Sequence, residues 1–234
     1  MANTEKLGAK KNAQTEENES FVSKSLEFYN KYENVIYGVL VAILVIVGGI
    51  WALNKFYITP RNEKASALIV KPIEMFARGD SLSLVSALEG TEEDDGFLTI
   101  ISDFKMTRTA NTAKYYAALC YLHQGNKEEA LDYLKQFKKK ENVMWYAAQA
   151  LIGDLYDDQG DEAEAIKYYK KAVKGEDPYF TPISLFKLGQ MYERSENWKE
   201  ALKCYQTIEQ DFYDQYTSMG VDRYTERAAV KVAQ

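Results

Sequence analysis

Residues able to carry catalysis are few in this 234-residue chain. His123 is the only histidine, and no second histidine or cysteine stands at metal-ligand spacing from it. The sequence also lacks a Gly-x-Ser-x-Gly elbow, a phosphate-binding Gly-rich loop and a dinucleotide fingerprint. We interpret His123 as an exposed polar residue, because a Ser–His–Asp site would have to be assembled around this single imidazole. The sequence therefore predicts no enzyme, no cofactor and no bound metal.

Two other groups of side chains could bind a metal or react. The acidic stretch from Glu89 to Gly96 suggests calcium, but it lacks the Asp-x-Asp/Asn-x-Asp/Asn-Gly ladder and the distal glutamate of a calcium loop. We predict a solvated loop there. Cys120 and Cys204 belong to no Cys-x-x-Cys motif and cannot form a disulfide framework. Both are predicted to be small packed apolar groups, so they do not identify the compartment.

One long segment, residues 35–53 (VIYGVLVAILVIVGGIWAL), contains no charged residue. As a helix it would extend roughly 29 Å, which is the thickness of a bilayer's hydrocarbon core. Tyr37, Trp51 and Tyr57 lie near its ends, where aromatic rings favour the lipid–water boundary. A cleaved signal peptide fits less well, because a polar stretch of residues 1–34 precedes it and no Ala-x-Ala site follows. We predict an uncleaved transmembrane helix that crosses once.

The segments around this span differ in composition. Residues 1–20 are polar and predicted to be disordered, whereas residues 21–34 show the spacing of a juxtamembrane amphipathic helix. Residues 54–110 are predicted to form connecting helices that pack on the following domain, with a bend at Pro72. The basic residues flanking the span do not decide its orientation: Lys24 and Lys31 on one side, Lys55, Arg61 and Lys64 on the other.

The net charge of −6 argues against a nucleic-acid partner, because binding phosphates requires a basic face. The short run Lys138–Lys140 is interpreted as a solvated helix end, where cations also suit the helix dipole.

From Asn111 onward the chain repeats itself, with marker alanines at positions 130, 165 and 201. Small residues at 118, 153 and 189 would let the two helices of each unit approach closely, with a tyrosine at 121, 156 and 192 between them. Gly125 and Gly160 suit left-handed turns. Glu196 takes this place in the third unit, so we expect its turn to use Asn197 instead.

These landmarks resemble the tetratricopeptide repeat (TPR), over residues 111–213, with Phe137 as a departure from a small residue. Together with the span predicted above, the resemblance implies an all-α chain: one N-terminal transmembrane helix followed by an α-solenoid of helix–turn–helix units, with residues 214–234 as a capping helix. Stacked repeats are needed because a single unit cannot bury its apolar face.

The order of segments along the chain, a transmembrane span followed by TPR units, is similar to that of YfgM-like proteins, single-span bacterial TPR proteins that are ancillary subunits of the Sec translocon. The matching motifs are Lys31-Tyr32, Gly49 with Trp51, and Ala65-Ser66. This resemblance implies an inner-membrane location, a periplasmic C-terminal domain, and partners among secretion or folding machinery and exported clients. An envelope-assembly or cell-division scaffold and a cytoplasm-facing receptor remain alternatives.

In the TPR family the first helices line the concave face. The equivalent positions predict a partner-binding groove that is apolar at one end and acidic in its middle; the residues are Tyr115, Leu119, Leu122, Asp154, Asp157, Asp158, Phe186, Gln190 and Glu193. The Lys, Arg and Asn residues of a carboxylate clamp are absent from these positions, so a terminal carboxylate would be repelled. Binding through a convex or juxtamembrane surface is an equal alternative, and no small-molecule substrate is expected.

Overall fold

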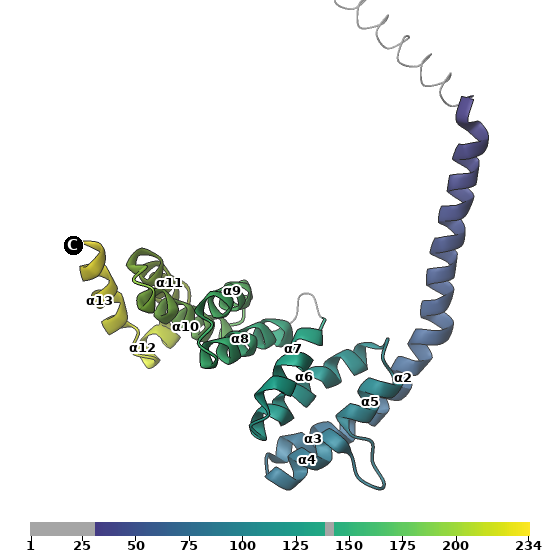
Figure 1. The fold of residues 1–234 in the computed structure, drawn as a ribbon, viewed down its shortest axis with the longest axis horizontal. Coiled ribbons are helices and arrows are strands. Elements are labelled where there is room, and N and C mark those ends of the chain that lie inside the picture. The colour runs from purple at the N-terminus through teal and green to yellow at the C-terminus, as the bar shows by residue number, and fades with distance from the viewer. Residues whose placement is uncertain (1–30, 139–142) are drawn as a thin grey trace, which may run out of the picture. The chain divides into compact units, whose positions relative to one another are not determined.

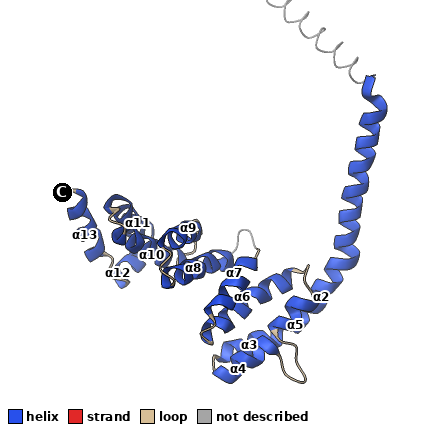
Figure 2. Ribbon diagram, in the orientation of Figure 1, coloured by secondary structure: helices blue, strands red, loops and turns tan. Residues whose placement is uncertain are grey.

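The computed structural model describes residues 31–138 and 143–234. The predicted tail 1–20 and most of the predicted helix 21–34 lie outside these residues. The chain divides into two units, Met1–Ile58 and Thr59–Gln234, which are described separately. The regular elements of the described residues are helices, as Figure 2 shows by colour.

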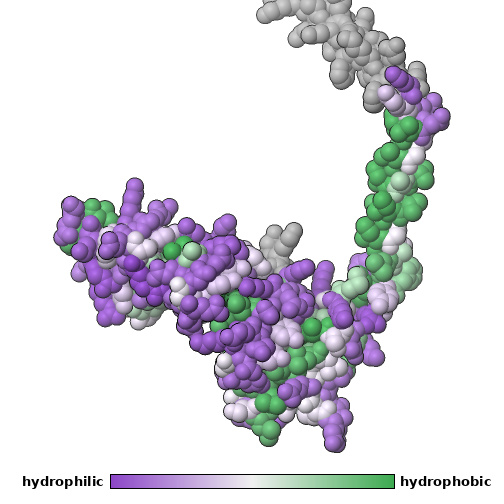
Figure 3. All heavy atoms as spheres, viewed as in Figure 1, coloured by the Kyte–Doolittle hydropathy of each residue, from purple (hydrophilic) through white to green (hydrophobic). Residues whose placement is uncertain are grey.

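The described part of the first unit is a helix over residues 31–53 followed by the π-helical turn η1 (Asn54–Ile58). Its large apolar side chains are exposed, for example Leu44 at 70% and Val45 at 69%. Figure 3 shows this apolar surface along the helix. Near its end the Trp51 ring meets Phe56 edge-on at 6.2 Å, and the Lys55 ammonium lies 5.0 Å from the Trp51 ring centroid. By length and composition this helix suits a membrane anchor or a signal sequence.

The second unit begins with helices that carry no repeat landmark: α2 (Thr59–Leu68), α3 (Val70–Arg78), α4 (Ser81–Glu89) and α5 (Phe97–Asp103). The break between α2 and α3 falls at Ile69, because Pro72 has no N–H to donate to the carbonyl of Leu68. Gly79 ends α3 with φ of 75°, and the Asp80 side chain caps α4 by accepting from Ser83 N at 2.9 Å. Across the acidic loop a bridge joins Gly90 and Asp95, and within the described residues no group of His, Cys, Asp and Glu could hold a metal.

Helix–turn–helix pairs follow in chain order, as Figure 1 shows: α6 (Arg108–His123) with α7 (Lys127–Gln136), α8 (Val143–Asp158) with α9 (Glu162–Ala172), and α10 (Phe180–Arg194) with α11 (Trp198–Asp211). The short α12 (Tyr213–Ser218) and α13 (Asp222–Val232) complete the chain, and α13 packs against α11. Buried apolar clusters run along the unit from α2 to α13, so the core is shared between neighbouring pairs.

The turns inside the pairs are built alike. The amide after the left-handed residue donates to the carbonyl of the landmark tyrosine: Asn126 to Tyr121 at 2.9 Å, Asp161 to Tyr156 at 2.9 Å and Asn197 to Tyr192 at 2.8 Å. The left-handed residues are Gly125 (φ 82°), Gly160 (φ 78°) and, in the third pair, Glu196 (φ 57°).

The expectation that Asn197 would replace Glu196 in the third turn is therefore wrong. Glu196 adopts the left-handed conformation itself, because the bond from Asn197 N to Tyr192 O requires it there. Asn197 instead caps α11, where its side chain accepts from Glu200 N at 3.4 Å.

Aromatic rings fill the space between paired helices. The rings of Tyr121 and Tyr133 stack at 5.5 Å, as do those of Tyr156 and Tyr168. A Cβ placed on Gly153 would lie 2.8 Å from the Tyr169 ring, so this glycine allows α8 and α9 to approach. Gly189 meets the ring of Tyr205 in the same way.

Candidate interaction groove

A groove of about 490 Å³ lies in the second unit between α8, α10 and α13. Predicted groove residues from the second and third repeats line it: Asp154, Asp157, Asp158, Gln190 and Glu193. The remaining lining side chains are Tyr169, Lys187, Met191, Arg194, Tyr224 and Arg227. Polar groups from successive repeats thus face one hollow.

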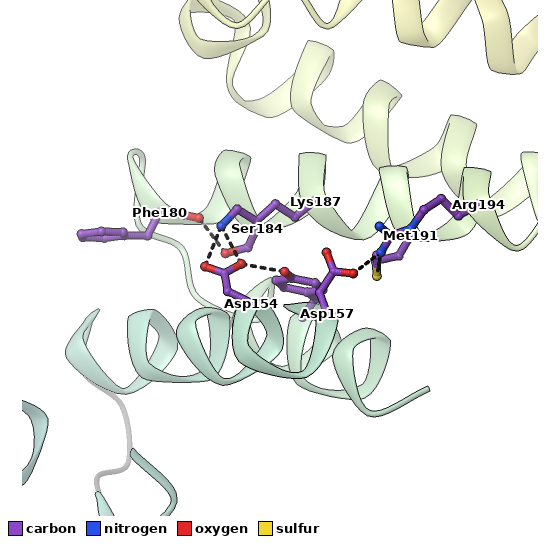
Figure 4. Close-up of polar contacts among 8 residues, drawn as sticks. Asp154, Asp157, Phe180, Ser184, Lys187, Met191 and Arg194 are labelled. Atoms are coloured by element: carbon purple, nitrogen blue, oxygen red, sulfur yellow. Dashed lines mark hydrogen bonds and ion pairs between the residues drawn. The ribbon is translucent and has the colours of Figure 1, made fainter. Parts of the chain in front are cut away.

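Asp154 is the most connected of these carboxylates. It accepts from Lys187 Nζ at 2.6 and 2.7 Å and from the Tyr169 hydroxyl at 2.6 Å. Figure 4 shows Lys187 reaching from α10 to Asp154 on α8. Burial raises the pKa of Tyr169, and its hydrogen bond to Asp154 raises it further. The hydroxyl therefore stays a donor and holds Asp154 in place.

The other acids of the groove are paired as well. Asp157 accepts from Arg194, whose Nε also lies 3.5 Å from Glu162. Asp158 accepts from Lys127 Nζ at 2.7 Å, and Glu193 accepts from Arg227, with Nε at 3.3 Å.

The ion pairs connect neighbouring repeats. Lys187 is 33 residues from Asp154, Arg194 is 37 from Asp157, and Arg227 is 34 from Glu193. These separations are close to one repeat period: two of the pairs join α8 to α10, the first helices of successive repeats, and the third joins α10 to α13, the helix that follows the last repeat. The groove is therefore a ladder of opposite charges, which corrects the expected acidic middle: bases from the following helix neutralise the acids.

The remaining predicted residues do not line this groove. Tyr115 on α6 is half-buried and packs its ring against Phe137 at 5.6 Å. Leu119 and Leu122 are also half-buried, and Leu122 packs on the apolar cluster between α6 and α8. Phe186 meets Tyr224 edge-on at 4.8 Å. Tyr115, Leu122 and Phe186 thus contribute to packing.

Sequence reasoning missed Lys187, Tyr224 and Arg227 as groove residues. Lys187 lies one position away from the family positions used for the prediction, and α13 was treated only as a cap. The sequence did contain a signal for the two basic residues. One repeat length after Glu193 stands Arg227, and about one repeat length after Asp154 stands Lys187. Such a count identifies charge pairs between stacked repeats.

The residues with reactive side chains lie outside the groove. His123 is exposed, and its ring centroid lies 6.3 Å from that of Phe76. Cys120 and Cys204 are free and buried, and burial raises the pKa of each thiol to about 12. Protonated thiols are poor nucleophiles and poor metal ligands.

The class of fold follows from this geometry: the chain is all-α, with a long N-terminal apolar helix followed by a solenoid of helix–turn–helix repeats. Three segments match the tetratricopeptide repeat: residues 112–141, 146–174 and 184–209. The chain therefore carries TPR units.

Solved structures agree at the level of the fold. Nearly identical TPR-like repeats from a Podosopora anserina protein assigned as a kinesin light chain are 16% identical, with a TM-score of 0.53 over 73% of this chain and 88% of that chain. A second structure of these repeats is also 16% identical, with a TM-score of 0.52 over 73% and 89% of the two chains. No curated protein matches the chain.

Proposed function

We propose that this chain is a membrane-anchored, non-catalytic module that binds a protein partner in the groove between α8, α10 and α13. The observation that carries the proposal is the groove itself, whose polar side chains are held in fixed positions by ion pairs between repeats. Stacked helical repeats use such concave surfaces to bind polypeptides. The apolar helix over residues 35–53 would keep this surface at a membrane.

The ion pairs of the groove indicate what kind of partner segment would bind there. The groove's cations and carboxylates are already paired, so a strongly charged ligand would have to break an existing pair. The uncharged amide of Gln190 and the Tyr224 ring also line the groove. An extended polypeptide with amide and apolar groups would therefore fit better than a terminal carboxylate.

Crosslinking at matched glutamines tests the groove. A photoreactive amino acid at Gln190, inside the groove, is expected to capture a partner in cells that express the full chain. Gln206 is exposed on α11 outside the groove and serves as the control. Equal capture from both positions would contradict groove binding.

A charge swap tests the same surface without removing the ion pair. In the double variant Asp154→Lys with Lys187→Asp the pair is kept but its direction is reversed. We expect crosslinking from Gln190 to fall, while the thermal midpoint falls no further than in Tyr169→Phe, because the swap keeps the ion pair and removes only the carboxylate that accepts from the Tyr169 hydroxyl. Unchanged crosslinking would argue for a different surface.

From the resemblance to YfgM-like proteins we further propose a periplasmic repeat domain that assists protein export or folding beside the Sec translocon. A reporter enzyme fused after Gln234 tests this topology, because a periplasm-active and a cytoplasm-active reporter give opposite results. Site-specific crosslinking from residues 54–110 then tests proximity to the translocon. Failure of the second experiment alone would favour an envelope scaffold, and cytoplasmic activity of the reporter would favour a cytoplasm-facing receptor.

A further inference from the structure

A second hollow, of about 680 Å³, lies at the start of the repeat array, between the loop before α6 and the end of α7. The basic side chains that line it are Lys105, Arg108, Lys114 and Lys138. Met106, whose side chain is 61% exposed, and the ring of Phe137 add apolar surface. No Asp or Glu of the described residues lines this hollow, which we call the basic pocket.

The charge of the basic pocket is unusual for this chain. The whole sequence carries a net charge of −6, and the groove bases Lys187, Arg194 and Arg227 each bind a carboxylate. By contrast, none of the four cations of the basic pocket forms an ion pair with a carboxylate of the described residues. Like charges that face one hollow repel each other unless an anion lies among them.

The pocket is held in shape by fixed contacts. The Asn111 side chain accepts from Lys138 N at 2.8 Å and donates to Lys138 O at 2.6 Å, which ties the residue after Phe137 to α6. Thr107 is buried; its hydroxyl donates to Phe104 O at 2.8 Å and accepts from Ala110 N at 3.0 Å. Burial and the nearby Lys138 both lower the pKa of Lys114, because the ammonium groups of the two lysines repel each other.

We propose that the basic pocket binds an acidic segment of a protein partner, with carboxylates among Lys105, Arg108, Lys114 and Lys138. A polypeptide suits the site because Thr112, which lines the pocket, lies on α6 close to Tyr115, one of the residues predicted to face the concave side. Phe137, which also lines the pocket, contacts Tyr115 from the same predicted set. A chain that follows the concave side would thus pass the pocket. This site is separate from the groove, so its test does not depend on groove binding.

Direct binding to the full chain tests the proposal. The protein is placed in phosphatidylcholine nanodiscs and titrated against a short fluorescein-labelled oligo-glutamate peptide, followed by anisotropy. We expect binding that weakens as salt rises, because the site is open to solvent. An oligo-glutamine peptide is expected not to bind, and equal binding of the two peptides would overturn the proposal.

Charge reversal locates the binding. The double variant Arg108→Glu with Lys138→Glu is expected to weaken peptide binding by about tenfold, since reversing each exposed charge removes one attraction and adds one repulsion. Lys138 keeps its bonds to Asn111 in this variant, because they involve only its main chain. The double variant Lys199→Glu with Lys203→Glu changes two exposed lysines on α11 outside both hollows; it is the matched control and should bind as the parent does. Equal affinities for the double variant and the parent would overturn the proposal.

Two further measurements separate direct contact with the peptide from a loss of stability and from lipid binding. Lys114→Gln removes one cation without adding a repulsive charge, and a smaller loss of affinity with an unchanged thermal midpoint supports direct contact. The titration is repeated in nanodiscs that contain phosphatidylglycerol. If anionic lipid abolishes the peptide binding that Arg108 and Lys138 control, the pocket takes lipid headgroups and the proposal fails.

Discussion

Tyr169 and Tyr205 hold equivalent places in successive repeats, each with its ring against a glycine. The Tyr169 hydroxyl donates to Asp154 at 2.6 Å, whereas the Tyr205 hydroxyl is buried without a hydrogen-bond partner among the described residues. Burial raises the pKa of Tyr205 and the nearby Glu193 raises it further, but the Glu193 carboxylate is bound to Arg227. The same side chain therefore has different energetic roles in the two repeats.

Removing each hydroxyl should show this difference. Tyr169→Phe is expected to lower the free energy of unfolding by about 1–2 kcal/mol, because a hydrogen bond to a charged group is lost. Tyr205→Phe is expected to change it by less than about 0.5 kcal/mol or to raise it, because an unsatisfied buried group is removed. Urea titration of the full chain in detergent, followed by circular dichroism, measures both. Equal losses would show that Tyr205 has a partner.

Glu196 supports a second prediction at this scale. A non-glycine residue in the left-handed region is strained, and the equivalent turn residues are Gly125 and Gly160. Glu196→Gly is expected to raise the free energy of unfolding by about 0.5–1 kcal/mol, the relief of strain exceeding the added flexibility of the unfolded chain. Glu196→Ala keeps the strain and should be close to neutral. A gain with alanine as large as with glycine would point to the charge of Glu196 instead.

At the scale of the helices, the close approach of α8 and α9 depends on Gly153. A methyl group there would lie 2.8 Å from the Tyr169 ring, so Gly153→Ala is expected to lower the free energy of unfolding by about 1–3 kcal/mol through overpacking. If the clash is the cause, Gly153→Ala combined with Tyr169→Leu should cost less than the sum of the single losses. At Gly160, where φ is 78°, an added Cβ would meet no other atom within 4 Å, so the losses from Gly160→Ala and Tyr169→Leu should simply add. The same urea titrations give all of these values.

Local pattern was enough to predict the paired helices and the turns at Gly125 and Gly160, but not the left-handed Glu196 of the third turn. The glycines at 125 and 160, the marker alanines and the paired tyrosines depend on contacts within one repeat, and a single sequence displays them. The groove was predicted less completely, because its lining is built from contacts between repeats. Asp154 was identified as a groove residue, but its partner Lys187 comes from a helix 33 positions later. Whether a charged side chain is paired depends on residues in the next repeat. The groove prediction used only positions within single repeats, so it could not identify these partners.

The break in the helix before α3 has a similar physical origin. Pro72 predicted a bend, but the structure breaks at Ile69 and keeps Pro72 inside α3. A proline disturbs the hydrogen bond to the residue four positions earlier, so the effect appears upstream of its own position.

For the whole molecule, the apolar segment is expected to decide where the chain resides. The full chain should remain with membranes after alkaline extraction without detergent. Leu44→Asp with Val47→Asp places two carboxylates near the middle of the span, each costing about 2.5–3.5 kcal/mol in the bilayer. We expect this variant to move largely to the aqueous fraction. Leu82→Asp with Val85→Asp makes the same changes at the same spacing on α4, where both side chains are exposed, and should leave the fractionation unchanged. Recovery of the parent chain in the aqueous fraction would contradict anchoring by residues 35–53, and every role assigned to the repeats at a membrane would need another tether.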